Sequence, residues 1–194
     1  MNIGITGRRS AIAQEFLKFL SPEDKVIYGT AQDLPLDLDQ YFLCAGVIVG
    51  KNIVDIDESE ACDMLRVNFV DVVKLCEKIF KVNPKARICI VGSESGFKGS
   101  FDIVYAASKA GVHLYVESKR LQHASQHLVC VAPTIIEDTG MTRRRGDVEE
   151  TMRRGKERRL GRWLRAQEVA RTCHFVLSED ALCNTVVRMT GGNW

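Results

Sequence analysis

Residues 2–13 read Asn-Ile-Gly-Ile-Thr-Gly-Arg-Arg-Ser-Ala-Ile-Ala, and this stretch decides the fold. Its first half is a short apolar run that predicts a strand ending at Gly7. Apolar side chains then recur at positions 12, 16, 19 and 20, which is helical spacing. In α/β proteins such a turn lies at the carboxyl end of its strand, where backbone N–H groups suit a pyrophosphate. Gly7 is the only glycine of the turn, and the alanines at 11 and 13 still permit close backbone approach.

The same alternation continues along the chain. Short apolar runs predict strands at 25–30, 41–49, 87–91, 128–132 and 185–189. Helical patterns precede or follow them at 11–20, 57–80, a segment reaching to about 126, and 167–178, whereas 134–161 is polar and irregular. Strands without period-two alternation are typical of a sheet covered on both faces. The sequence therefore predicts an α/β protein: a single-domain Rossmann fold spanning 1–194, with a doubly wound parallel sheet and helices on both faces.

Composition excludes several other classes of protein. At 45% hydrophobic and 27% charged residues, with a net charge of +2, the chain is ordinary for a globular protein and does not suggest a nucleic-acid or membrane partner. No apolar run approaches the ~18 residues of a membrane span. The seven cysteines are odd in number, lack C-x-x-C spacing and lie mostly in apolar runs, which indicates a reducing compartment. With no charged leader at the N-terminus, we expect a cytoplasmic protein.

The stretch Tyr105-Ala106-Ala107-Ser108-Lys109 carries the chemistry. On a helix, residues four apart leave the same face about one turn apart. A free phenol loses its proton only near pH ~10, and a fixed ammonium nearby favours the phenolate. The spacing therefore suits an acid/base pair, although Tyr-x-x-x-Lys also occurs by chance on amphipathic helices.

Together these motifs resemble the short-chain dehydrogenase/reductase family. Thr6-Gly7 with 11–13 resembles its Thr-Gly-x-x-x-Gly-x-Gly turn, and 44–46 (Cys-Ala-Gly) the end of its Asn-Asn-Ala-Gly segment. Residues 105–109 match its Tyr-x-x-Ser-Lys in full, with Ser93 twelve residues upstream and Asn68 on the preceding helix. Segments 133–141, 167–170 and 191–192 fit its C-terminal part. The chain departs from the family at two turn glycines, at 43–44 and at Thr134, and its connection after the second strand is unusually short.

The resemblance implies a role for each matching residue. Tyr105 would be the acid/base, Lys109 would favour its phenolate and hold the nicotinamide ribose, and Ser93 would hydrogen-bond the substrate oxygen. Asn68 would hold a water behind Lys109, and Ser95 is a competing candidate for the serine role. The residues implied in cofactor binding are Gly7, Arg8, Arg9, Ser10, Ile12, Thr30, Asp37, Leu38, Cys44, Ala45, Gly46, Tyr105, Lys109, Pro133, Ile136 and Thr139. No metal site is predicted.

The cofactor prediction favours NADP(H) and leaves NAD(H) as the alternative. A carboxylate at the end of the second strand would bond the adenosine ribose and repel a 2′-phosphate, but that strand ends Tyr28-Gly29-Thr30. Arg8 and Arg9 stand in the first turn, where a cation could pair with the phosphate.

The segment after the strand at 128–132, about 134–165, is expected from the resemblance to close over the substrate. Within it, 142–165 holds ten Lys/Arg against four Asp/Glu, a net +6. This indicates an anionic substrate, with a solvated charged surface as the plain alternative. Nucleic acid is disfavoured, because Trp163 is the only aromatic residue there to stack on a base.

The sequence thus predicts an enzyme that interconverts a carbonyl and a secondary alcohol with NAD(P)(H). The alternative is a non-catalytic nucleotide-binding protein that regulates or scaffolds a partner, which the lost turn glycines favour. Epimerase or dehydratase chemistry on a nucleotide sugar is a third option, for which the chain looks too short.

The resemblance implies a homodimer or homotetramer, and the apolar stripe over 62–79 is compatible with it. His123 and His127, read as i, i+4 on one helix face, are interpreted as surface residues.

Overall fold

The computed structural model describes residues 1–143 and 147–192. Six parallel strands form one sheet in the order β2-β1-β3-β4-β5-β6. Their bounds are β1 Asn2–Thr6, β2 Lys25–Tyr28, β3 Gln40–Leu43, β4 Arg87–Val91, β5 His127–Pro133 and β6 Thr185–Met189. The predicted doubly wound parallel sheet is confirmed. β2 pairs with one edge of β1, and the chain then crosses back so that β3 pairs with the other edge. The direction in which strands are added therefore reverses at β1.

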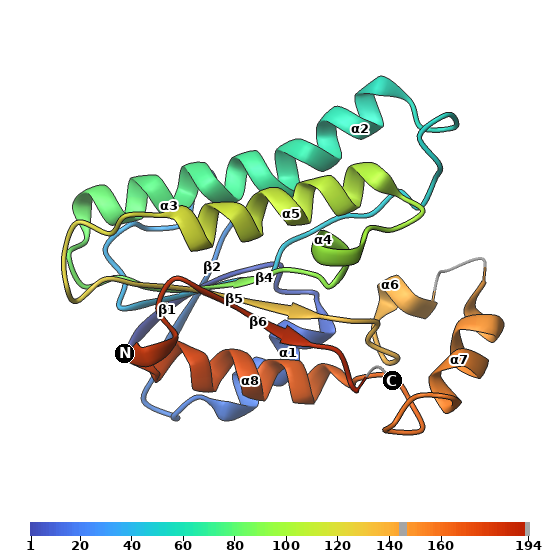
Figure 1. Cartoon of the computed structure of the whole chain (residues 1–194). Coiled ribbons are helices and arrows are strands. Elements are labelled where there is room, and N and C mark those ends of the chain that lie inside the picture. The colour runs from blue at the N-terminus through green and yellow to red at the C-terminus, as the bar shows by residue number, and fades with distance from the viewer. Residues whose placement is uncertain (144–146, 193–194) are drawn as a thin grey trace.

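Helices cover both faces of the sheet (Figure 1). One face carries α1 (Ala11–Phe16), its 3-10 extension η1 (Leu17–Phe19), α8 (Ala166–Ser178) and the short turn η3 (Asp180–Leu182). The other carries α2 (Glu58–Leu65), the π-helix η2 (Arg66–Val70), α3 (Asp71–Val82) and α5 (Ile103–Ser118). Each face has its own core, with Phe16 stacked on Phe42 at 4.2 Å between ring centroids on the α1 side.

Two predicted elements are shorter in the structure. The strand expected over 41–49 ends at Leu43, and residues 44–49 form an irregular segment at the carboxyl edge of the sheet. The helix expected to reach about 126 ends at Ser118. Asn184 explains this end, because its side-chain amide donates to the carbonyls of Val116 and Lys119, both at 2.8 Å. A cap from the far end of the chain therefore stops α5.

The long helix predicted over 57–80 is interrupted by η2. Bonds from i to i+5 rotate the helix face relative to an α-helix. Val72, Cys76 and Ile79 are buried as predicted, but Cys62 and Leu65, before the π-helix, are exposed. The apolar stripe is therefore not continuous, and η2 instead turns Asn68 into the interior, where it is 1% exposed.

Beyond β5 the chain leaves the sheet before returning as α8. The segment predicted to be irregular contains α6 (Gly140–Arg143) and α7 (Val148–Lys156), which lie beyond the carboxyl ends of the strands (Figure 1). An isolated parallel bridge joins Ile136 to Leu164 at its base. Helix α7 packs on Trp163, whose ring nitrogen donates to the Thr151 carbonyl at 2.7 Å. No helix among the described residues has the length and hydrophobicity to cross a bilayer.

Candidate active site

Asn68 and Lys109 converge on Gly46. A Cβ built on Gly46 would lie 3.3 Å from Asn68 Oδ1 and 3.6 Å from Lys109 Nζ. Asn68 accepts from the Val47 N–H and donates to the Val47 carbonyl, both at 2.8 Å. Lys109 Nζ donates to the Val91 carbonyl at 3.0 Å, at the carboxyl end of β4. Three segments far apart in sequence therefore meet at this point.

Tyr105 lies one turn before Lys109 on α5. Lys109 Nζ is 5.9 Å from the centroid of the Tyr105 ring, and both side chains are buried. Asp102 caps the helix, accepting from the Tyr105 N–H at 2.9 Å through one oxygen and from the Gly50 N–H at 2.9 Å through the other. This fully buried carboxylate ties the first turn of α5 to the loop after Gly46 and so fixes the place of the phenol.

Ser93 follows β4 directly, two residues after the carbonyl that holds Lys109. It is partly exposed, and its hydroxyl accepts from the Ser95 N–H at 3.2 Å. The competing candidate Ser95 begins the short helix α4 (Ser95–Lys98). Ser93 therefore lies at the carboxyl edge of the sheet together with Lys109, whereas Ser95 belongs to α4.

The turn after β1 is built around Gly7. Its φ is +72°, and a Cβ there would lie 2.7 Å from the Ala45 nitrogen and the Cys44 carbonyl carbon. Ser10 caps α1 by accepting from the Ile12 N–H at 3.2 Å. Cys44 Sγ lies 3.2 Å from the Ser10 hydroxyl, and burial raises the pKa of this thiol to about 11. The turn and the end of β3 are thus packed backbone against backbone.

A pocket of about 430 Å³ opens beside this turn. It lies between the carboxyl ends of β1, β2 and β3 on one side and the start of η2 and α3 on the other. Its lining residues are Thr6, Gly7, Gly29, Thr30, Ala31, Gln32, Leu43, Ala45, Arg66, Val67, Asp71, Val72 and Leu75. Gly7, Thr30 and Ala45 are among the residues expected from the sequence to bind the cofactor. Arg66 and Gln32 are not, although Arg66 stands two residues before Asn68 and this proximity was the available signal.

Arg8 and Arg9 are exposed on the turn, and the Arg8 guanidinium carbon lies 5.8 Å from the centroid of the Tyr28 ring. Asp37 and Leu38 do not join them. They precede β3 and lie at the amino edge of the sheet, where the Leu38 N–H donates to the Tyr41 hydroxyl at 2.9 Å. Their predicted adenine contact is corrected, because β3 begins at residue 40 and runs away from them.

Pro133, Ile136 and Thr139 follow β5. The Pro133 carbonyl accepts from the Glu94 N–H at 2.8 Å, which holds this segment beside Ser93. Ile136 is buried, and its carbonyl accepts from the hydroxyls of Thr139 at 3.2 Å and Thr142 at 2.7 Å. The backbone after β5 is therefore a fixed wall at the same edge as Tyr105 and Lys109.

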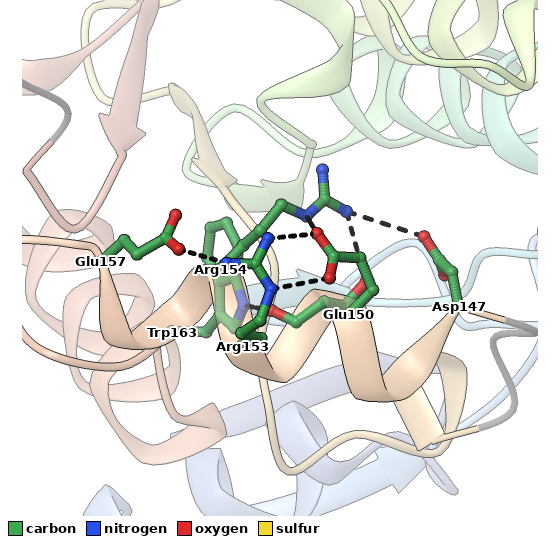
Figure 2. Close-up of polar contacts among 7 residues, drawn as sticks. Asp147, Glu150, Arg153, Arg154, Glu157 and Trp163 are labelled. Carbon is green, nitrogen blue, oxygen red and sulfur yellow. Dashed lines mark hydrogen bonds and ion pairs between the residues drawn. The ribbon is translucent and has the colours of Figure 1, made fainter.

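Four arginines of the basic segment form ion pairs within the chain. Figure 2 shows Arg153 between Glu150 and Glu157 on α7, with Arg154 reaching Glu150 and Asp147. Two further ion pairs join Arg162 to Glu168 and Arg165 to Glu137. Arg143, Lys156 and Arg159 are exposed, and Arg144 and Arg145 lie outside the described residues.

Trp163 is buried among these residues, with the Arg158 guanidinium 4.3 Å from its ring. Its ring forms the core of this segment and is therefore not exposed for stacking on a base.

The two histidines are not on a helix face. His123 lies in the loop after α5, and His127 begins β5, where it is 1% exposed and its Nε2 lies 2.9 Å from the Val176 carbonyl. The interpretation of His127 as a surface residue is wrong. No group of three or more potential metal ligands occurs within 1–143 and 147–192.

A model of the short chain dehydrogenase family matches residues 22–150, and the chain belongs to this family. The fold agrees with solved structures. A small-chain dehydrogenase in complex with NADPH has a TM-score of 0.85 at 16% identity, over 99% of this chain and 97% of that one. A glucose/ribitol dehydrogenase-type member from Brucella melitensis has a TM-score of 0.82 at 16% identity, over 98% and 95%.

A 3-oxoacyl (acyl-carrier-protein) reductase from Agrobacterium tumefaciens with NADP bound has a TM-score of 0.80 at 17% identity, over 99% and 93%. None of the curated proteins matches the chain by sequence.

Proposed function

We propose that this member of the family is an NADP(H)-preferring oxidoreductase that interconverts a carbonyl and a secondary alcohol. The observation that carries the proposal is the convergence of Asn68 and Lys109 on Gly46, with Tyr105 one turn away. A nicotinamide would supply the hydride when bound. Tyr105 donates or accepts the proton, Lys109 holds the nicotinamide ribose beside it, and Ser93 hydrogen-bonds the substrate oxygen.

The residues of the pocket fit the adenosine half of such a cofactor. Gly7 lets the turn pack directly on the backbone of residues 44 and 45, and the backbone N–H groups of such a turn at the carboxyl edge suit a diphosphate. The apolar wall of the pocket suits a base, with Arg66 and Gln32 at its rim. The small-chain dehydrogenase and the 3-oxoacyl (acyl-carrier-protein) reductase among the structural neighbours, solved with NADPH and NADP respectively, support the cofactor class.

The proposed preference for NADPH rests on Arg8 and Arg9 in the turn after β1. Residues 29–30, which follow β2, carry no carboxylate themselves, and the nearby Asp33 carboxylate accepts from the Thr30 N–H and hydroxyl. We expect Arg9→Ala to weaken NADPH binding about tenfold, because it removes one charge-assisted contact to the 2′-phosphate, and to leave NADH binding unchanged. Titration of wild type and variant with both reduced cofactors measures this. Tighter NADH than NADPH binding by the wild type would refute the preference, and Lys18→Ala, at an exposed position on η1, is the matched control.

An anionic substrate is the finer proposal, with the exposed Arg143, Lys156 and Arg159 as its candidate contacts. Because four arginines of the segment are already paired with carboxylates, the charge available to a substrate is smaller than the net +6 indicates. The Michaelis constant for such a substrate should rise with ionic strength. A Michaelis constant independent of salt would contradict the proposal.

A homodimer or homotetramer is proposed from the exposed apolar side chains of Leu65, Val70 and Leu114 on α2, η2 and α5. Sedimentation of the purified chain tests it, and a monomer at micromolar concentration would contradict it.

We also propose that 1–194 acts as one nucleotide-binding domain in which about 134–165 is the substrate segment. A cytoplasmic location remains a prediction that fractionation of cells would test.

A further inference from the structure

His113 is a buried imidazole without a hydrogen-bond partner. It lies one turn after Lys109 on α5, is 4% exposed, and neither ring nitrogen is bonded within the described part of the chain. Burial, together with the positive charges of Lys109 and Arg188, lowers its pKa to about 4. The ring is therefore neutral at pH 7. A buried polar group left unpaired is uncommon and calls for an explanation.

The ring occupies the space beneath the Ser93 turn. A Cβ on Gly92 would lie 2.7 Å from His113 Nε2, and a Cβ on Gly96 would lie 2.6 Å from His113 Cε1. Phe97 stacks on the imidazole with 4.4 Å between centroids. The imidazole thus fills the space that side chains at 92 and 96 would need.

The opposite side of the turn is held by backbone bonds to the next strand. The Gly92 N–H donates to the Val131 carbonyl and the Glu94 N–H to the Pro133 carbonyl, both at 2.8 Å. The Gly96 N–H donates to the Ser93 carbonyl at 3.0 Å, which closes the turn itself. These bonds fix where the turn leaves β4, and His113 is what fills the space between the turn and α5.

The helix after the turn is clamped from a third side. The Glu94 carboxylate is 1% exposed, accepts from Lys98 Nζ at 2.8 Å and lies 3.6 Å from Arg188. The Arg188 guanidinium carbon lies 4.4 Å from the centroid of the Phe97 ring, and Phe97 also stacks on His113. A column therefore runs from β6 through α4 to α5, with His113 at the end nearest Lys109.

We propose that His113 is a positioning residue for Ser93: its imidazole supports the turn 92–96 from the side of α5 and so sets the position of the Ser93 hydroxyl. The inference rests on the proposed role of Ser93. It also makes a claim about the fold that does not depend on catalysis, and the two are tested separately.

Hydrogen exchange on the chain without ligand tests the structural claim. In His113→Ala, the amides of Glu94 and Gly96 should exchange about tenfold faster, because the support beneath their turn is gone. His113→Phe, which keeps an aromatic ring against Phe97, should restore slow exchange. The matched control is His123→Ala, in the exposed loop after α5. Unchanged exchange at Glu94 and Gly96, or an equal increase throughout α5, would overturn the proposal.

A double-mutant cycle tests the link to Ser93, with NADPH and an activated vicinal diketone as the probe substrate. Ser93→Ala should lower kcat about 100-fold, and His113→Ala about tenfold with the NADPH dissociation constant within twofold of wild type. Combined, the two changes should cost no more than Ser93→Ala alone, because His113 acts through that hydroxyl. Multiplicative losses, or a kcat that His113→Phe fails to rescue, would refute the role. A wild type that binds NADPH but turns over no carbonyl would count against the proposed function, while the exchange result would stand.

Discussion

Tyr105→Phe is expected to lower kcat by at least about 1,000-fold while NADPH binding stays within twofold. General acid/base catalysis contributes ~10²–10⁴-fold, and phenylalanine keeps the ring but carries no exchangeable proton. The phenol oxygen makes no hydrogen bond within the described residues, so its loss should leave stability nearly unchanged. Turnover of NADPH with a carbonyl probe, beside a cofactor titration, measures both quantities.

Tyr115→Phe is the matched control, because it makes the same change on the same helix. The Tyr115 hydroxyl donates to Glu77 Oε1 at 2.8 Å, far along α5 from Lys109. We expect normal turnover and a stability loss of about 1 kcal/mol. Biological function that survives Tyr105→Phe would instead favour the alternative of a non-catalytic nucleotide-binding protein.

Gly7→Ala should be the most damaging single methyl group in the cofactor half of the site. The residue has φ +72°, and its Cβ would meet the backbone of residues 44 and 45 at 2.7 Å. Left-handed backbone costs about 1–2 kcal/mol for an L-residue, and a contact that cannot relax adds about 1–3 kcal/mol. We expect a loss near 3 kcal/mol in the free energy of unfolding, measured with denaturant, and NADPH binding weakened more than tenfold.

Gly161→Ala separates the two causes. Gly161 has φ +66°, close to that of Gly7, but a Cβ there meets nothing within 4 Å. This variant should lose only the backbone term, about 1 kcal/mol, and bind NADPH normally. Equal losses for the two variants would show that the close approach of the turn to β3 contributes little.

The sequence predicts best what is decided locally. The strand, turn and helix of 2–16 follow from apolar spacing and one glycine, and Tyr105 and Lys109 share a face because they are four residues apart. The extent of α5 could not be predicted, because 119–126 has good helix formers and ends the helix only through partners elsewhere. Gln126 donates to the carbonyls of Phe80 and Asn83 at 2.7 and 3.0 Å, and so holds this loop in a non-helical path.

The π-helix was equally hidden, since side-chain periodicity carries no trace of a change from i+4 to i+5 bonding. Its consequence for the site is large, because it directs Asn68 inward to Val47. His113 was missed for a related reason. A histidine on an apolar helix face gives no signal until the glycines at 92 and 96 are seen above it, although those glycines were visible in the sequence.

The bridge between Ile136 and Leu164 brings the two ends of the α6–α7 excursion together. Lengthening a closed loop costs little conformational entropy, about 0.6 kcal/mol for each doubling of length. The residues between Ile136 and Leu164 could therefore be exchanged, shortened or extended during evolution while β5, α8 and the proposed catalytic edge keep their places. Substrate range could then diverge among relatives through changes in this excursion alone, independently of the residues proposed to handle hydride and proton.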